Sequence, residues 1–390
     1  MKKELKMVLL TLMGATMAIT SCSQDETVES LAVKPEGRQE IEFHLDMMSR
    51  ATDRTITNLD TIWVYADDGK ETVFEATAFI KDQYGNFKPE EKMYWPEGKD
   101  NLNFTAFWPS PDVLNHDPNH TEENHAKLSL SPGNVTLDSE IAWNTAYHYD
   151  LITAVATINR DVANGGIPLA FKHAFAQVEF RAKIGESAEH RVDIYGIQLR
   201  VSNTKGVYSL TQDLWTLLSS QQYFKSAPNG VLTVSDTPRS LTEKTGPMYL
   251  LPATWQFVQY FTGAKENSNG VFLMVFGKAY DEEGVQIYPK AEDMGDTNRV
   301  PSNSYIEGMS AYQDITTTGI MRIQLGGLED FKVESGNKYV FTIDFTNGIG
   351  NFSHKDKEKP SQPIINNSLT TKVSVESWKM YDDINVDSNQ

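Results

Sequence analysis

The sequence predicts an all-β protein built from many short antiparallel strands. Apolar and polar residues alternate with a period of two through much of the chain, which places one row of side chains against a core and the other toward water. Helical spacing is scarce: Leu214, Leu217 and Leu218, following Asp213, predict one short helix. Many strands without a repeat of fixed period favour two β-sandwiches in tandem.

The first strand is predicted at 41–47, where Ile41, Phe43, Leu45 and Met47 alternate with polar residues. This is the clearest alternation near the start of the chain. Further predicted strands carry the rows Ile62 and Val64; Leu102, Phe104, Ala106 and Trp108; Val178, Phe180, Ala182 and Ile184; Met321, Ile323 and Leu325; Tyr339, Phe341, Ile343 and Phe345; and Val373 and Val375.

Glycines mark the turns and one irregularity. The apolar row changes phase across Gly196, as a β-bulge would require. Asp68-Gly69, Tyr84-Gly85-Asn86 and Asn164-Gly165-Gly166 contain residues that tolerate positive φ. We place the join between two domains at the last of these, which gives an N-terminal β-sandwich at 39–165 and a C-terminal one at 166–390.

The N-terminal segment has the features of a bacterial export signal. Lys2, Lys3 and Lys6 precede an apolar run that is too short to span a bilayer, and small residues precede Cys22, the one cysteine in the chain. The run Ile19-Thr20-Ser21-Cys22 resembles a bacterial lipobox. This resemblance implies removal of residues 1–21 and attachment of lipid chains, palmitate among them, to Cys22.

Residues 22–38 are polar and read as a flexible tether between the membrane and the first domain. Ser23-Gln24-Asp25-Glu26 resembles the acidic stretch that sends lipoproteins of Bacteroides-like bacteria to the cell surface. The alternative is a solvated linker. The lipid would be the sole anchor, because no other apolar stretch approaches membrane-spanning length.

Charge and cysteine usage exclude several classes of protein. The formal net charge is -18, which makes nucleic acid an unfavourable partner. A single cysteine excludes an intramolecular disulfide, so stability must come from packing. The chain of 390 residues is long enough for two domains and a linker.

No motif predicts an enzyme, a metal site or a cofactor. His116, His120 and His125 are better explained by a polar loop than by a metal site, because Pro118 breaks the helix that their spacing would suit. His173 reads as a half-buried structural residue without a nucleophile.

Aromatic and acidic residues leave two further functions open. Trp108 and Trp143 are the tryptophans that we expect to be most exposed, as in a sugar-stacking surface. Abundant carboxylates leave a glycoside hydrolase as the least supported alternative.

Several segments together resemble the fimbrillin family of Bacteroides-type bacteria, the subunits of protease-matured pili. The resemblance spans most of the chain. The segments are the lipobox at Cys22; Ile41-Glu42-Phe43 followed by Arg50-Ala51; Thr61-Ile62-Trp63-Val64-Tyr65; Met93-Tyr94-Trp95-Pro96; Leu102-Asn103-Phe104-Thr105-Ala106-Phe107-Trp108-Pro109; Asp150-Leu151-Ile152; 169–180; Leu250-Leu251-Pro252; and Val373-Ser374-Val375-Glu376-Ser377-Trp378.

The resemblance implies two transthyretin-like β-sandwich domains and assembly by strand exchange. In shaft subunits of that family, cleavage after an arginine removes the first strand and opens a groove for a strand of another subunit. Arg50, followed by Ala51, best matches that cleavage point, with Arg54 and Arg38 as alternatives. The other interpretation is that Arg50 is a loop residue after a strand.

The resemblance also implies a donor strand at the C-terminus. Met380, Ile384 and Val386 form a sparse alternating row that fits such a strand. Asp382 lies on the same row and departs from a well-formed donor. A tip, minor or anchoring subunit therefore remains an alternative to a shaft subunit, as does a surface lipoprotein that never polymerises.

The leading hypothesis is a structural component of surface fimbriae that acts in cell adhesion, without catalysis or cofactors. Its expected partners are other fimbrial subunits, the outer membrane through Cys22, and a host or bacterial surface ligand. The second hypothesis is a surface glycan-binding lipoprotein that feeds nutrient uptake.

Overall fold

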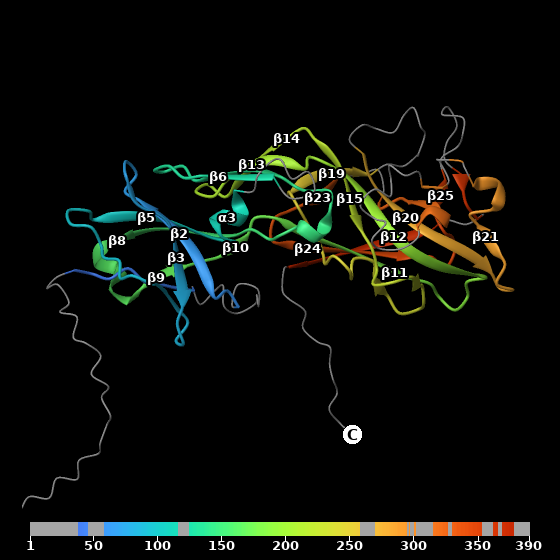
Figure 1. The fold of residues 1–390 in the computed structure, drawn as a ribbon, viewed down its shortest axis with the longest axis horizontal. Helices are drawn as coiled ribbons and strands as arrows, with labels where there is room; N and C mark the ends of the chain where they lie inside the picture. The colour runs from blue at the N-terminus through green and yellow to red at the C-terminus, as the bar shows by residue number, and fades with distance from the viewer. Residues whose placement is uncertain are drawn as a thin grey trace, which may run out of the picture. The chain divides into compact units, whose positions relative to one another are not determined.

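The computed structural model describes residues 38–45, 58–115, 125–257, 270–294, 296, 300–301, 315–326, 330–352, 362–365 and 369–377. Their regular structure is mostly β-strand (Figure 1), which confirms the predicted all-β class. The helical elements of these residues are the single turn α3 (Pro111–Leu114) and the 3-10 turns η1 (Thr145–Tyr147), η2 (Arg160–Gly165), η3 (Ala291–Asp293) and η4 (Ile315–Thr317). No helix in these ranges is long and apolar enough to cross a membrane.

The N-terminal part of the chain forms an eight-stranded sheet in the order β10-β8-β5-β2-β3-β4-β1-β9. Its neighbours pair antiparallel, apart from β1 and β9, which are parallel. Many of its apolar side chains, among them Phe43, Phe79 and Phe104, form one hydrophobic cluster, whereas Tyr65 and Phe107 belong to a second. The strands are β1 (Phe43–Leu45), β2 (Thr61–Asp67), β3 (Thr72–Lys81), β4 (Asn86–Pro89), β5 (Asn101–Trp108), β8 (Ile152–Asn159), β9 (Ile167–Leu169) and β10 (Lys172–His173).

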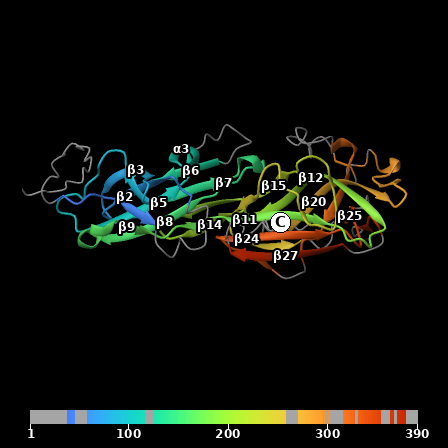
Figure 2. The ribbon, with the colours of Figure 1, turned by 90° about the horizontal axis from the view of Figure 1, so that it is seen from below.

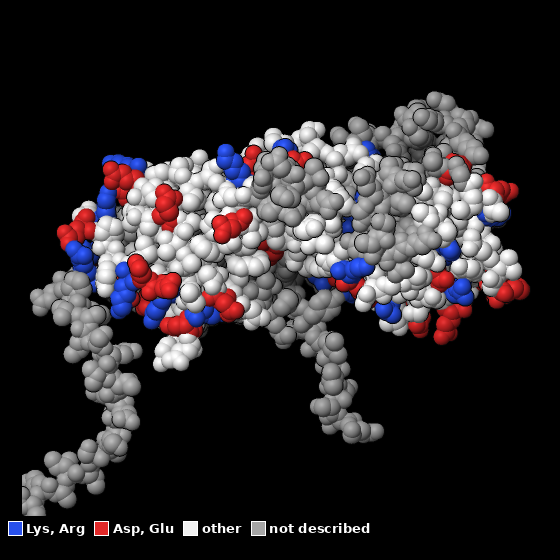
Figure 3. Space-filling view, in the orientation of Figure 1, with Lys and Arg blue, Asp and Glu red and all other residues white. Residues whose placement is uncertain are grey.

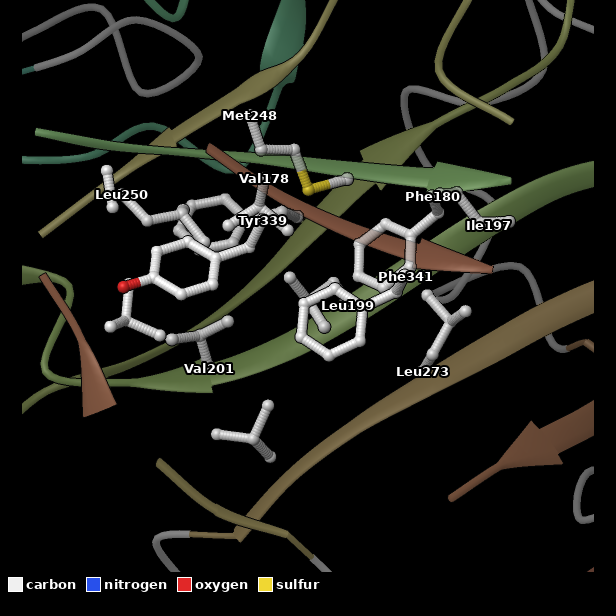
Figure 4. Close-up of a cluster of buried hydrophobic side chains, with 14 of the residues drawn as sticks. Val178, Phe180, Ile197, Leu199, Val201, Met248, Leu250, Leu273, Tyr339 and Phe341 are labelled. Carbon is white, nitrogen blue, oxygen red and sulfur yellow. The ribbon is translucent and has the colours of Figure 1, made fainter. Parts of the chain in front are cut away.

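Two further sheets contribute to a second core. A ten-stranded sheet follows the order β15-β12-β20-β22-β25-β26, with four short strands off this path. Figure 4 shows side chains of this sheet, such as Leu199 and Leu273, packed against Phe180 and Phe341 of another sheet. The strands are β12 (His190–Ser202), β15 (Gln221–Ser226), β16 (Leu232–Thr233), β19 (Ala253–Phe257), β20 (Gly270–Asp281), β21 (Gln286–Tyr288), β22 (Gly319–Ile323), β23 (Phe331–Val333), β25 (Asn351–Phe352) and β26 (Gln362–Pro363).

The opposing sheet has five strands and ends on β27, the last strand of the described residues. Its order is β17-β11-β24-β27, with β18 paired to β11. Figure 2 shows β11, β24 and β27 side by side, with β27 outermost. The strands are β11 (Ala176–Lys183), β17 (Arg239–Ser240), β18 (Met248–Leu250), β24 (Asn337–Asp344) and β27 (Thr370–Ser377).

A four-stranded sheet, β14-β13-β7-β6, contains the segment for which a helix was predicted. Leu214, Leu217 and Leu218 lie on a strand, so that prediction was wrong. Trp215 and Leu217 face inward at a spacing of two, whereas Leu214 and Leu218 are exposed. The helical spacing was therefore coincidental. The strands are β6 (His125–Ser129), β7 (Thr136–Glu140), β13 (Lys205–Ser209) and β14 (Leu214–Leu218).

The predicted bulge and turns are confirmed. The register between β12 and β20 shifts between Ile194 and Gly196. Gly69, Gly85 and Gly166 have φ values of 86°, 85° and 85°. Beyond Gly166, β9 and β10 still belong to the eight-stranded sheet. The four-stranded sheet combines β6 and β7, which precede Gly166, with β13 and β14, which follow it. The division into domains at 165/166 stays a prediction.

Replacing Gly319 by Ala is expected to destabilise the fold by roughly 2 to 3 kcal/mol. A Cβ there would overlap the ring of Tyr288, which is held by a 2.8 Å hydrogen bond from its hydroxyl to the carbonyl of Ile320. Guanidinium unfolding measures the change. Gly165→Ala is the control, because no atom lies within 4 Å of the added Cβ. Equal stability of the two variants would contradict the prediction.

Candidate functional site

The first strand, β1, occupies an interior position in its sheet. It pairs antiparallel with β4, with Phe43 opposite Phe87, and parallel with β9, with Phe43 opposite Ile167. A strand near the start of the chain thus separates two strands that follow it far along the sequence. Without it, β4 and β9 would have no strand between them.

The inner row of β1 is buried completely. Ile41, Phe43 and Leu45 are 1%, 0% and 3% exposed. The ring of Phe43 makes edge-to-face contacts with Phe79 and Phe104, at centroid distances of 4.8 and 5.2 Å. Such pairs add to the stabilisation from burial alone. The predicted alternation at the start of the chain is confirmed for these three residues, and Met47 lies outside the described residues.

Backbone hydrogen bonds fix the same segment on both sides. The N–H of Ile41 donates to the carbonyl of Met93 at 2.9 Å, and the N–H of Ile167 donates to the carbonyl of Glu42 at 2.9 Å. The N–H of Trp95 donates to the carbonyl of Gln39 at 2.8 Å. Loss of β1 would leave unpaired edges next to an uncovered apolar row, which is the condition that favours pairing with another strand.

The outer row of this segment carries Glu40 and Glu42 ahead of His44, and both carboxylates lie beside lysines. Lys88 lies 3.4 Å from Glu42 and 3.2 Å from Asp82, and Lys92 lies 3.3 Å from Glu40. The hydrogen bond that Lys88 donates to Asp82, with Glu42 adding to it, raises the pKa of Lys88, although burial acts in the opposite direction. On the face in Figure 3, acidic and basic side chains are interspersed. Lys88 and Lys92 form the rim of this segment, where each lies beside at least one carboxylate.

The last strand, β27, lies at an edge of its sheet. Its one strand neighbour in the described structure is β24, and Val373 and Val375 stand opposite the buried Phe341 and Tyr339. Val373 and Val375 are nevertheless 38% and 55% exposed. The C-terminal strand therefore presents an apolar row that its own sheet covers incompletely.

Comparison with known proteins identifies the family. A sequence model described as fimbrillin-like matches residues 49–378. The chain belongs to the fimbrillin-like family. This confirms the resemblance found in the sequence.

One solved structure shares the fold of this fimbrillin-like chain, and others are more distantly similar. A fimbrial protein from Bacteroides vulgatus aligns at a TM-score of 0.51 and 13% identity, over 88% of this chain and 100% of that chain. A proposed cell adhesion protein from Bacteroides uniformis aligns at a TM-score of 0.47, 14% identity and the same coverage of 88% and 100%. The fimbrial anchor protein Mfa2 from Porphyromonas gingivalis aligns at 0.32 and 11%, covering 89% of this chain and 100% of Mfa2. Comparison with curated proteins gave no match.

Most of the site residues predicted for this fimbrillin-like chain lie outside the described residues. These are Cys22, Arg50, Ala51, Arg54, Met380, Ile384 and Val386, with His116 and His120 of the histidine-rich loop. Arg38 is described and exposed. Within the described ranges, no group of three or more His, Cys, Asp or Glu residues is placed to hold a metal ion.

His173 is buried rather than half-buried, which corrects the prediction. Its Nδ1 lies 2.5 Å from Oδ2 of Asp150, and both side chains are only 4% exposed. No local pattern indicates this partner, because Asp150 precedes β8, His173 lies on β10, and the two residues meet only where β10 pairs with β8. The pair reads as a structural contact within the fimbrillin-like fold.

The two tryptophans expected to be exposed are half-buried. Trp108 packs at the margin of the N-terminal cluster. The ammonium group of Lys225 lies 4.4 Å from the ring centre of Trp143, so this face is covered by a cation–π contact. Neither ring forms the open platform that sugar stacking would use. The lysines of the rim and the aromatic pocket around Phe43 were not foreseen, because cross-strand partners cannot be read from alternation.

The stability of the chain is expected to fall as the pH drops from about 6.5 toward 4. Burial lowers the pKa of His148 to about 4 from its ordinary 6.5, against a raising effect of its hydrogen bond to Ala142. Nε2 donates to that carbonyl at 2.8 Å and Nδ1 accepts the N–H of Tyr249 at 3.2 Å, so the folded ring is neutral. The unfolded chain therefore binds this proton more tightly than the folded chain. The free energy of unfolding should fall by roughly 2 to 3 kcal/mol between pH 6.5 and pH 4.

Guanidinium unfolding at several pH values measures this effect. His148→Gln removes the titration, so its stability should change less between pH 6.5 and 4 than that of the unaltered chain. Identical pH profiles would contradict the assignment.

Proposed function

We propose that this fimbrillin-like chain is a subunit of surface fimbriae that acts in cell adhesion and joins other subunits by exchange of β1. In this proposal β1 closes the groove between β4 and β9 until the chain is cleaved between Arg50 and Ala51. A strand from another subunit then takes its place. The chain performs no catalysis and needs no cofactor.

The proposal includes the route by which the subunit reaches its place. Residues 1–21 are removed, Cys22 carries the lipid that holds the precursor at the outer membrane, and 22–38 form the tether. Two tandem transthyretin-like β-sandwich domains, 39–165 and 166–390, follow. The C-terminal segment containing Met380, Ile384 and Val386 is the candidate donor strand, continuing from the edge strand β27.

The observation that carries the proposal is the interior position of β1. Ile41, Phe43 and Leu45 are buried, and the strand pairs on both sides, yet it precedes the predicted cleavage point by only a few residues. Exposing three such side chains costs roughly 5 to 9 kcal/mol. A groove of this depth would favour capture of a replacement strand.

The N-terminus of the protein on intact cells of the source organism tests the proposal. Filaments sheared from the surface should contain chains that begin at Ala51, and membranes should retain precursor that begins at lipidated Cys22. Arg50→Ala should leave only the Cys22 form and no filament-bound subunit. Arg54→Ala is the matched control and should be processed normally. Filament-bound chains that begin at Cys22 would contradict exchange of β1.

A further inference from the structure

The shape of the groove under β1 specifies which strand can replace it. We propose that the replacement comes from a different protein and carries a large aromatic side chain between two aliphatic ones at alternate positions, with acidic residues on its outer row. This chain's own C-terminal segment does not meet that requirement. The inference rests on the proposed function, since it assumes that β1 leaves.

The aromatic requirement follows from the middle position of the groove. Phe43 sits opposite Phe87 and makes edge-to-face contacts with Phe79 and Phe104. Phe79, Phe87 and Phe104 are themselves at most 1% exposed, so they are held by the surrounding core. A smaller side chain would leave a cavity that such a packed site closes only in part.

The two flanking positions require aliphatic side chains. Ile41 and Leu45 are 1% and 3% exposed and belong to the same cluster as Phe43. A polar or charged side chain at either position would be buried without a partner, which is strongly unfavourable. The inner row therefore reads aliphatic, aromatic, aliphatic.

The outer row favours negative charge at its start. Lys92 and Lys88 accommodate Glu40 and Glu42 at 3.3 and 3.4 Å, so the rim complements an acidic strand. Because both lysines are substantially exposed, these ion pairs help to set the register of the strand and add little to its binding affinity.

The C-terminal segment of the chain satisfies only part of this pattern. If Asp383 takes the place of Glu40, then Ile384 takes that of Ile41, but Val386 and Ser388 fall at the positions of Phe43 and Leu45. The middle pocket is underfilled and a hydroxyl is buried. In the other register, Ile384 takes the position of Phe43. Asp382 then takes the position of Ile41, which buries a charge. Neither register reproduces β1, which argues against a homopolymer.

Peptide exchange on the cleaved but intact protein tests the inference. A rare protease sequence at Arg50–Ala51 allows the folded chain to be nicked, so that β1 stays bound until a peptide displaces it. Three peptides compete in turn: 38–47, the unaltered 380–390, and 380–390 carrying V386F and S388L. A labelled 38–47 peptide is first exchanged into the groove in place of β1. Its displacement by each unlabelled peptide is then followed by fluorescence anisotropy.

We expect 38–47 and the doubly substituted peptide to compete at least about 100-fold more strongly than unaltered 380–390, because they fill the middle and third positions. The control is 380–390 carrying N385F, whose added ring faces outward and should bring no comparable gain. Unaltered 380–390 competing within about threefold of 38–47 would overturn the inference. Failure of 38–47 itself to exchange would instead overturn the proposed function.

Charge reversal at the rim supplies a second readout. K88E together with K92E should weaken direct binding of a labelled 38–47 peptide about two- to fivefold, and a labelled 38–47 peptide carrying E40K and E42K should recover it. Equal binding of both peptides to both proteins would remove the acidic outer row from the proposal.

Discussion

A chain that begins at Ala51 is expected to lose its N-terminal sheet as a stable structure and to regain it when a peptide of residues 38–47 is added. Ile41, Phe43 and Leu45 together contribute roughly 5 to 9 kcal/mol by burial, which is comparable to the whole stability of an ordinary domain. The backbone bonds to Met93, Trp95 and Ile167 are lost in addition.

Circular dichroism and thermal unfolding measure this effect against a chain that begins at Ser23. The shortened chain should show a lower unfolding temperature, and the peptide should raise it with one-to-one stoichiometry. A peptide carrying F43D is the matched control, because it keeps the backbone of β1 but buries a charge. A shortened chain as stable as the longer one, with no peptide bound, would show that β1 does not close a groove.

Phe43→Ala in the uncleaved chain is expected to destabilise the fold by about 3 to 5 kcal/mol. The side chain is fully buried, and its contacts with Phe79 and Phe104 hold the middle of the groove. The core around it is already packed, so the cavity would close only partly. Guanidinium unfolding measures the change in free energy.

Ile80→Ala is the control for this substitution. Ile80 lies on β3 of the same sheet and is 50% exposed, so its loss should cost less than about 1 kcal/mol. A loss at Phe43 as small as that at Ile80 would mean that β1 contributes little to the sheet, and the aromatic requirement inferred for a replacement strand would fail with it.

The sequence predicts the local structure of this protein better than its pairing. The rows that contain Phe43 and Leu45, and Tyr339, Phe341 and Ile343, lie on strands, because a period of two turns one row of side chains toward the core. The phase change at Gly196 is a bulge for the same reason. At Leu214 to Leu218, helical spacing was misleading, because Trp215 and Leu217 are the side chains that face the core.

The partners of each strand depend on contacts that no local pattern records. β1 pairs with β9, more than a hundred residues further along the chain, and the aromatic pocket for Phe43 combines side chains from β3, β4 and β5. The pairing of Lys88 with Glu42 likewise arises only when β1 lies against β4. The sequence therefore allows β1 to be anticipated as a removable strand. The selectivity of the groove for a replacement strand could not be anticipated.

A reversible disulfide between β1 and β4 tests most directly whether β1 must leave. His44 and Asn86 are opposite each other in the register of these strands, a spacing that a disulfide can bridge, so H44C with N86C should lock β1 in place. N101C with N159C is the control, because it joins β5 to β8, which stay together. On cells kept under oxidising conditions, the locked subunit should be absent from filaments. After reduction of the disulfide it should enter them, while the control enters under both conditions. Entry of the locked subunit into filaments without reduction would contradict the account.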